Sequence, residues 1–408
     1  MNKNIATKNP FNIIVIVAAL GYFVDIYDLI LFGIVMKPSL KAIGVPDEQM
    51  FDIGGQLLGM QMIGMLIGGI IWGVLGDKKG RLSTLFLTIL LYSLANIANG
   101  FVQTVEQYKW MRFIAGMGLA GELGIGITLV SEVMTKESRG IGTSIVSCIG
   151  IIGAVLGFLV ADLFDWRMAY YVGGGLGLLL LVMRISVYES GMFERTKQKN
   201  ISRGNFLSLF TNAKQFKKYF LCIAIGVPVW YVISQLVVQS SAYAKELGIH
   251  GEVVGGKAVM FHYIGASIGS LLFGLLSERL KSRKQSLFYA TGSLGILIVA
   301  YFFMHGISST LFYTIITLMG VSMGGLWTVF MANASEQFGT NIRSTVTTTA
   351  PNFVRGTTEL IRLSITGMKS SIGLWPAGLL IGVIVLMLSL SSILLSEETH
   401  GKELDYTE

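Results

Sequence analysis

Long apolar runs separated by short polar segments form the main pattern of this sequence. A helix that crosses the hydrocarbon core of a bilayer needs about 20 apolar residues. Runs of that kind lie near 11–36, 53–76, 82–101, 107–131, 140–164 and 168–188, and again near 219–243, 256–277, 285–304, 308–333, 344–370 and 374–396. The pattern predicts an all-α polytopic membrane protein with twelve transmembrane helices, six on each side of one long polar segment.

That polar segment is strongly basic. It carries seven Lys or Arg and no Asp or Glu between Arg195 and Lys218. Because Lys and Arg collect in the cytoplasmic loops of membrane proteins, we predict a cytoplasmic linker at 191–218 between an N-terminal bundle at 1–190 and a C-terminal bundle at 219–408. An even number of spans on each side places both termini in the cytoplasm. We interpret the first apolar run as a retained span rather than a signal peptide, because it is too long and lacks a cleavage-like stop.

Composition excludes several classes of protein. Only 13% of the residues are charged, against about 25% in an average soluble domain. The net charge of +7 comes from the short basic loops, so it indicates membrane topology rather than a nucleic-acid partner. Cys148 and Cys222 lie inside apolar runs and suggest neither a disulfide framework nor a metal site. The sequence has no nucleotide-binding loop, zinc motif or nucleophile elbow, so we expect no enzymatic activity, cofactor or metal.

The two halves of the chain resemble each other. The stretch 73–81 (GVLGDKKGR) is echoed, one residue longer, by 274–283 (GLLSERLKSR). Two six-helix halves repeated in the same orientation are typical of transporters that rock about a site near the bilayer midplane. A duplication kept only for packing would explain the glycines of the repeat but not its charged residues. Five residues of the first half recur 204 residues later: Gly116, Gly121, Ser131, Glu132 and Arg139 correspond to Gly320, Gly325, Ser335, Glu336 and Arg343.

Three stretches carry a family resemblance. Residues 73–82 resemble the signature loop of the major facilitator superfamily, with Leu82 where that signature has a basic residue. Residues 112–122 (RFIAGMGLAGE) and 21–28 (GYFVDIYD) resemble the fourth-helix and first-helix patterns of its metabolite:proton symporter and organic-acid (sialate, aromatic acid) branches. The resemblance implies the major facilitator fold, with two pseudo-symmetric six-helix bundles. One departure is Gly191, where those branches usually have a proline.

In that family the signature loop latches the cytoplasmic ends of the two halves and controls rocking. The resemblance and the repeat together predict a charged latch in this chain. The alternative is that these charges only anchor the basic loops at the membrane surface. The predicted latch residues are Asp77, Arg81, Glu132, Arg139, Glu278, Arg283, Glu336 and Arg343.

Ionisable residues inside the first half are candidates for proton coupling, because charges inside a span are costly and are commonly functional. Asp25 and Asp28 share one helical face. A rise of about 1.5 Å per residue puts Asp28 about 25 Å along span 1 and Arg112 about 8 Å into span 4 from the other side, so the three can form one cluster. Two adjacent carboxylates near an arginine can take up protons. The alternative is a fixed ion pair that braces the two spans. Glu122 is a further coupling candidate, or else pairs with a neighbouring donor.

Span 11 is unusually polar for a membrane helix. Arg355, Glu359 and Arg362 follow one another at positions i, i+4 and i+7 and share a face. An arginine face at mid-membrane depth suits a carboxylate or another anion. The alternative is a self-neutralising face packed inside the second half. Aromatic and amide residues of spans 1, 7 and 10 would orient the substrate: Tyr22, Tyr27, Trp230, Tyr231, Gln235, Trp327 and Asn333.

We therefore predict a secondary active transporter that imports a small carboxylate-bearing or zwitterionic metabolite with protons, by alternating access. An organic acid, a sugar acid, an amino acid or an osmolyte fits this description. The alternative is a proton-driven exporter of a siderophore or a drug-like compound, although span 5 lacks the proline that exporters often carry there. The expected partners are the lipid bilayer, protons and a small-molecule substrate, without nucleic acid. We expect a monomer in the bacterial inner membrane.

Overall fold

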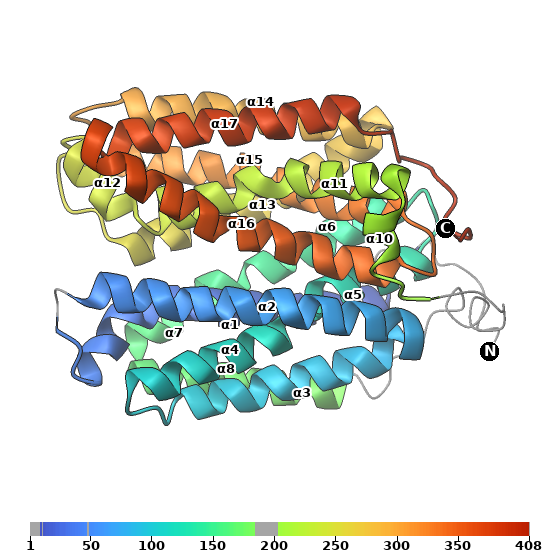
Figure 1. Cartoon of the computed structure of the whole chain (residues 1–408), viewed down its shortest axis with the longest axis horizontal. Coiled ribbons are helices and arrows are strands. Elements are labelled where there is room, and N and C mark those ends of the chain that lie inside the picture. The colour runs from blue at the N-terminus through green and yellow to red at the C-terminus, as the bar shows by residue number, and fades with distance from the viewer. Residues whose placement is uncertain (1–8, 10, 47–48, 184–202, 408) are drawn as a thin grey trace.

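The structure, a computed structural model, describes residues 9, 11–46, 49–183 and 203–407. Almost all of it is helical, and the long helices run along the long axis of the molecule in two layers (Figure 1). Helices α1 to α8 form one layer and α11 to α17 the other. The N-terminal layer consists of α1 (Ile13–Ala42), α2 (Met50–Lys79), α3 (Arg81–Asn99), α4 (Val105–Leu119), α5 (Glu122–Val133), α6 (Arg139–Ile151), α7 (Gly153–Leu163) and α8 (Trp166–Met183).

The second layer follows a short helix, α10 (Ser208–Thr211), that precedes its first long helix. That helix, α11, continues directly into a π-helical segment, η3. The elements of this layer are α11 (Ala213–Tyr231), η3 (Val232–Val237), α12 (Ser240–Glu246), α13 (Gly255–Leu280), α14 (Arg283–Phe303), α15 (Ser309–Gln337), α16 (Arg343–Ile372) and α17 (Leu374–Leu395).

The predicted spans agree with these helices to within several residues. In the described part of the chain, eleven helices are long and apolar enough to cross a membrane. Helix α16 is not among them, but with 30 residues it is as long as α1, and it packs against α2 and α5 of the first layer and α11, α15 and α17 of the second. Its Ser, Thr, Asn and Arg residues make it too polar for such a criterion. Some of those side chains find partners inside the bundle that lipid could not supply; the Asn352 amide, for example, donates to the Ala120 carbonyl oxygen at 3.0 Å.

Two predicted spans are divided in the structure. The fourth consists of α4 and α5, and the fifth of α6 and α7, each with an interruption of one or two residues. The predicted linker lies partly outside the described residues, because 191–202 are not described; its boundaries stay a prediction. Helix α11 begins at Ala213, within the range predicted for the linker.

The repeat seen in the sequence corresponds to a repeated helix packing. A methyl group in place of the Gly116 hydrogen would lie 2.2 Å from the Gln61 carbonyl oxygen, which shows how closely α4 approaches α2. At the corresponding place in the second half, a methyl group on Gly320 would lie 2.1 Å from the His262 carbonyl oxygen of α13. Small residues permit such backbone contact between membrane helices. The glycine matches of the repeat are therefore packing positions.

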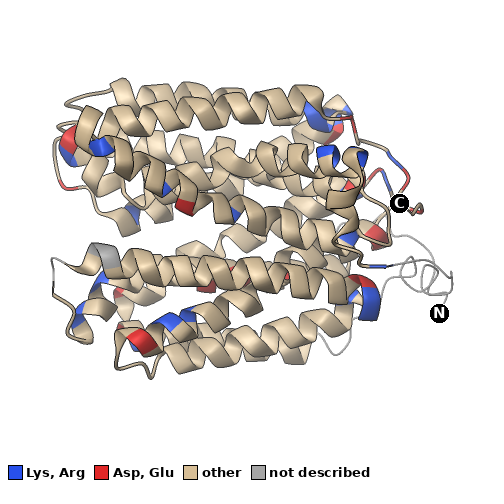
Figure 2. Ribbon diagram, viewed as in Figure 1, with Lys and Arg blue, Asp and Glu red and all other residues tan. Residues whose placement is uncertain are grey.

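Charged residues gather at the two ends of the layers, and few lie between them (Figure 2). At one end, α1 begins near Leu82 and Val133, and the segment after α17 contacts the loops that precede α6 and α16. We call this end, with Asp77, Arg139 and Arg343, the latch end. The opposite end, where α2 and α4 begin and α16 ends, is called the open end.

Candidate functional site

Two ion-pair nodes join the halves at the latch end, and they are related by the repeat. The Glu132 carboxylate accepts a hydrogen bond from Arg81 of its own half at 2.9 Å and another from Arg343 of the other half at 3.1 Å. Glu336 in turn binds Arg283 of its own half at 3.0 Å and Arg139 of the other half at 2.8 Å. All six side chains are almost completely buried. Each glutamate therefore links the two halves, and each node contributes one cross-half arginine.

Asp77 adds a contact that its counterpart does not repeat. Its carboxylate accepts hydrogen bonds from the backbone N–H groups of Ser344 at 3.1 Å and Thr345 at 2.8 Å, so it caps the first turn of α16 from the opposite half. A carboxylate at a helix N-terminus satisfies free N–H groups and matches the helix dipole. Asp77 also pairs with Arg81 at 3.3 Å, as the corresponding Glu278 does with Arg283 at 2.6 Å, and Glu278 has a further contact with His400 at 3.1 Å. The latch is thus symmetric in its two nodes and asymmetric in its signature loops.

The C-terminal segment covers both nodes. The Leu404 carbonyl oxygen accepts from Arg343 at 2.7 Å, and the Lys402 carbonyl oxygen accepts from Arg139. The Thr399 hydroxyl donates to Glu336 at 3.0 Å. Sequence reasoning missed this segment, because its partners bind main-chain oxygens that no residue pattern reveals. With Ser131 and Ser335 also hydrogen-bonded across the repeat at 3.1 Å, the halves are in contact throughout the latch end.

A cavity of about 590 Å³ separates the halves at the open end. It is lined by α2, by η3 and by the second part of α16, including Gly55, Gly59 and Gln235. Glu359 and Arg362 also line it and pair with each other at 2.5 Å while remaining partly exposed. We call this space the outer cavity. The protein is therefore closed at the latch end and open at the other.

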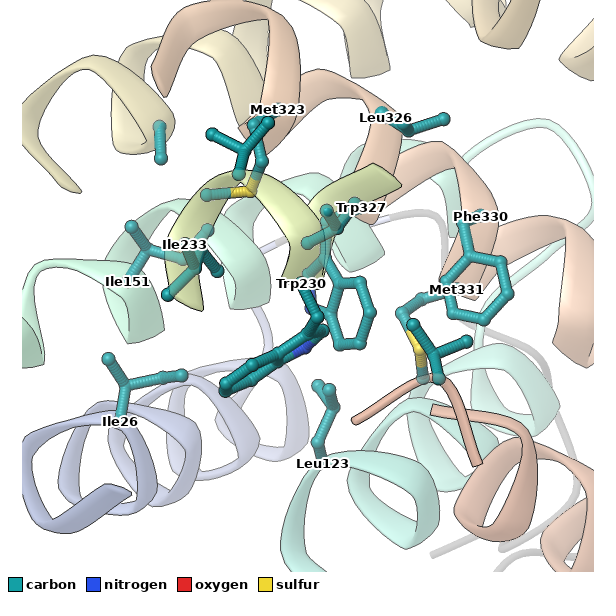
Figure 3. Packing of buried hydrophobic residues seen from close by; sticks show 14 of the residues in the cluster. Ile26, Leu123, Ile151, Trp230, Ile233, Met323, Leu326, Trp327, Phe330 and Met331 are labelled. Carbon is teal, nitrogen blue, oxygen red and sulfur yellow. The ribbon is translucent and has the colours of Figure 1, made fainter. Parts of the chain in front are cut away.

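A second, much smaller space of about 20 Å³ lies deeper between the halves. We call it the central pocket. Arg355 is part of its lining, and the guanidinium carbon lies 5.6 Å from the ring centre of Trp230 and 5.7 Å from that of Trp327. The Trp327 Nε1–H donates to the Tyr22 hydroxyl at 3.0 Å, which fixes that indole against α1. Figure 3 shows the two indoles side by side, between Ile26 of the first half and Met323 of the second.

The two aspartates of α1 are fully buried, and neither belongs to the lining of this pocket. The carboxylate oxygens of Asp25 accept no hydrogen bond from any described residue, and the charges that act on it most strongly are those of Arg355 and then Glu122. Asp28 lies nearer to Arg112, whose guanidinium packs over the Phe32 ring at 5.2 Å. Electrostatic interactions thus connect Asp25 with Glu122 and Asp28, and Asp28 with Arg112. Asp25 interacts mainly with a cation of the other half, and Asp28 with one of its own half.

Comparison with known proteins places this architecture in a family. The sequence profile described as Major Facilitator Superfamily matches residues 18–354. The chain belongs to this superfamily. It is therefore a multi-pass membrane transporter and not an enzyme.

Relatives of this major facilitator transporter match over nearly its whole length. It is 26% identical to the "Probable 4-methylmuconolactone transporter" of Cupriavidus pinatubonensis, covering 93% of this chain and 89% of that protein. It is 25% identical to the "Niacin transporter NiaP" of Acinetobacter baylyi, covering 95% of this chain and 94% of that one. Among solved structures, the proton:xylose symporter XylE bound to 6-bromo-6-deoxy-D-glucose matches with a TM-score of 0.71 at 16% identity, over 96% of this chain and 97% of that one. That likeness shows the fold alone.

Not all predicted substrate residues of this major facilitator transporter lie at a cavity. The Tyr27 hydroxyl donates to the Ala169 carbonyl oxygen at 2.8 Å, inside the first half. The Tyr231 hydroxyl donates to the Gly378 carbonyl oxygen at 2.7 Å and so fastens α11 to α17. Asn333 lies at the latch end, where it accepts from Thr399. These three side chains brace helices in the structure as described, and none of them lines the outer cavity or the central pocket.

Two features of the site could not be read from the sequence. Tyr263 of α13 lines the central pocket, but no pattern distinguished it from other aromatic residues. The π-helical segment η3 follows Pro228, which has no N–H to donate within α11. Pro228 is the one sequence signal for η3, because a proline inside a helix indicates an irregular segment. Single π-helical turns occur frequently at functional sites.

Proposed function

We propose that this major facilitator transporter imports a small metabolite that carries a carboxylate, together with protons, by alternating access. The observation that carries the proposal is Arg355, a buried cation between the two halves whose Nε has no hydrogen-bond partner among the described residues. A buried charge needs a partner. A guanidinium binds a carboxylate through two parallel hydrogen bonds, and a substrate carboxylate would supply that partner.

Asp25 supplies a route by which proton uptake can be coupled to substrate binding. Arg355 is the cation that acts on it most strongly, so Asp25 and a substrate carboxylate compete for the same guanidinium. Protonation removes the charge of Asp25 and leaves Arg355 to the substrate. Asp28, beside Arg112, is a second carboxylate that can bind a proton. Protonation of Asp25 frees Arg355 for the substrate, and a substrate carboxylate bound to Arg355 makes protonation of Asp25 more favourable. Substrate and proton therefore bind together.

The proposed import is compatible with the predicted topology. With both termini in the cytoplasm of a bacterium, the latch end faces inward and the outer cavity faces the periplasm. A substrate would enter that cavity, reach the central pocket and leave after the two latch nodes separate. The monomer encloses this whole path. The names of the relatives support a small ring compound as substrate, since niacin is a pyridine ring with a carboxylate.

Thermal unfolding in detergent tests the binding step. The probes are benzoate, nicotinate, gluconate and glycine betaine, each at acidic and at neutral pH. A ligand that binds the folded protein raises its unfolding midpoint by mass action. We expect stabilisation by carboxylates that is lost in Arg355→Ala and retained in Lys369→Ala, which removes an exposed cation from the same helix. Uptake of the stabilising compound into proteoliposomes, with and without an inward proton gradient, then tests coupling.

Two results would contradict the proposal. Stabilisation by carboxylates that persists in Arg355→Ala would remove Arg355 from the site. Stabilisation by bulky lipophilic cations alone would favour the exporter alternative.

A further inference from the structure

We propose that the central pocket selects a flat, mostly apolar ring with one carboxylate attached to it, and that the ring binds between the indoles of Trp230 and Trp327. This inference rests on the proposed function, because it assumes that Arg355 binds the carboxylate. It narrows the substrate to one of the classes that the sequence leaves open. Aromatic monocarboxylates such as benzoate and nicotinate belong to this class.

The residues that line the pocket favour a ring with few polar groups. Hydroxyl and guanidinium groups in this lining come only from Tyr22, Tyr263 and Arg355, and the Tyr22 hydroxyl is already the acceptor of the Trp327 N–H. A sugar acid would bring several hydroxyl groups into this space and leave most of them without a partner, which is costly for buried polar groups. A ring with a single polar group avoids that cost. The rest of the described lining is apolar or indole: Ile26, Ile151, Val229, Trp230, Ile233, Met323 and Trp327.

The placement of the two indoles carries the second step. Both rings lie within 6 Å of the Arg355 guanidinium carbon, at 5.6 and 5.7 Å. One guanidinium nitrogen is held by the Asn352 side-chain oxygen at 2.8 Å, while Nε has no partner among the described residues. A carboxylate that approaches Nε brings its attached ring toward the two indoles, whose placement relative to each other Figure 3 shows. Aromatic rings pack favourably face to edge or offset, whereas a puckered saturated ring of similar size does not make such contacts.

The size of the pocket adds a requirement. A space of about 20 Å³ holds about one water molecule, so a ring can bind only if the indoles separate. Trp230 precedes η3, and Ile233 and Gln235 of η3 belong to the walls of the central pocket and the outer cavity respectively. This π-helical segment is thus the partition between the two spaces. A movement of η3 would admit the ring from the outer cavity and would then place Trp230 over its face.

The test compares benzoate with cyclohexanecarboxylate, which has the same charge and ring size but is not flat. Dissociation constants are measured by isothermal titration calorimetry on the wild type, Trp230→Leu, Trp230→Phe, Arg355→Ala and a control, Trp110→Leu. Trp110 is 52% exposed and lies on α4, away from both cavities. We expect benzoate to bind the wild type about tenfold more tightly than cyclohexanecarboxylate. Trp230→Leu should abolish that preference, Trp230→Phe should retain part of it, and Trp110→Leu should leave it unchanged.

The outcomes separate this inference from the proposed function. The flat-ring inference is wrong if both ring acids bind equally well, or if glucuronate binds more tightly than benzoate. If Arg355→Ala abolishes the binding in either case, the carboxylate site still stands. If benzoate binds and Arg355→Ala does not weaken it, the proposed function fails at its first step. If no ring acid binds the wild type, the flat-ring inference is also wrong. A preference for benzoate that survives Trp230→Leu would exclude the Trp230 indole as its source and overturn the inference that the ring binds between the two indoles.

Discussion

The latch and the interior of this transporter use the internal repeat in opposite ways. At the latch, Glu132 and Glu336 each bind one arginine from either half, so the two nodes are nearly interchangeable. In the interior, the acids lie in the first half, at Asp25 and Asp28, and the pocket cation Arg355 lies in the second. The latch must hold two similar bundles together, and equivalent contacts from both serve that purpose. A small substrate has no two-fold symmetry, so the residues around it can diverge.

The strongest test of the symmetric region is removal of each node in turn. We expect Glu132→Gln and Glu336→Gln to lower the free energy of unfolding by similar amounts, about 3–5 kcal/mol, because each leaves the buried cross-half arginine, Arg343 or Arg139, without its carboxylate. Thermal or denaturant unfolding in detergent measures the effect. Exposed Glu403, which pairs with Lys136 at the surface, supplies the control: Glu403→Gln should change little. A large effect at one node with none at the other would show that the latch is not symmetric in energy.

The asymmetric region is tested by Asp28→Asn. The residue is buried beside Arg112, and the substitution keeps the shape of the side chain while removing its ability to take up a proton. We expect accumulation of substrate under a proton gradient to be abolished, while exchange of substrate across the membrane without a gradient continues and the unfolding midpoint changes little. Paired uptake and exchange assays in proteoliposomes measure this. Normal accumulation by the variant would remove Asp28 from the coupling mechanism.

A smaller and again symmetric effect is expected at the packing glycines. Gly116→Ala and Gly320→Ala each insert a methyl group against a backbone carbonyl oxygen at about 2 Å, so the helices must move apart. We expect each to cost about 1–3 kcal/mol of unfolding free energy. Gly175→Ala is the matched control, because a methyl group there meets no atom within 4 Å. If Gly116→Ala and Gly320→Ala differ widely, the repeat has diverged in its packing as well as in its chemistry.

The smallest effect concerns the C-terminal segment, at Glu398. Partial burial raises the pKa of this carboxyl, but hydrogen bonds from Ser282 and from the backbone N–H groups of His400, Arg283 and Thr399 hold its pKa below the ordinary value. A lowered pKa means that the contribution to stability is complete above the ordinary value near 4.5 and is lost as the pH falls through the lower value of the folded protein. Because the side chain is partly exposed, the contribution is small.

Glu398→Gln measures that contribution. We expect its unfolding midpoint to lie slightly below that of the wild type at neutral pH, and the difference to disappear on strong acidification. Glu397→Gln, which changes an exposed neighbour, is the control. A difference between Glu398→Gln and the wild type that grows on acidification would have the wrong sign for this mechanism.

Much of the fold could be predicted because its signals are local. Eleven of the twelve predicted spans follow from length and apolar composition, whereas α16 is too polar to meet that criterion. The Ser-Glu…Arg spacing of the repeat predicted four members of the latch, and the resemblance of the first loop to the family signature, with its echo in the second half, predicted the other four. The pairing itself, in which each glutamate takes one arginine from either half, depends on how the halves face each other and could not be predicted from spacing.

The site was less predictable, because its residues meet only through packing. Tyr22, Trp230 and Trp327 were among the predicted substrate residues, and the structure brings them to one pocket. Tyr27 and Tyr231 were in the same prediction by residue type, yet they turn to Ala169 and Gly378. Side chains close together on one helix point toward different parts of the protein. Residue type alone therefore cannot tell a residue that lines a pocket from one that holds two helices together.

The sequence by itself determined that this chain crosses a membrane many times, that its halves repeat and that charges occur where lipid would make them costly. Those properties depend on hydrophobicity and spacing along the chain, which need no knowledge of the fold. The tertiary structure alone decided that the latch end is closed under the C-terminal segment. It also decided that Arg355 lies between two indoles and that η3 separates the outer cavity from the central pocket. The Arg343–Leu404 and Arg355–Trp230 contacts join residues more than 60 positions apart, and only the packing of the helices brings such residues together.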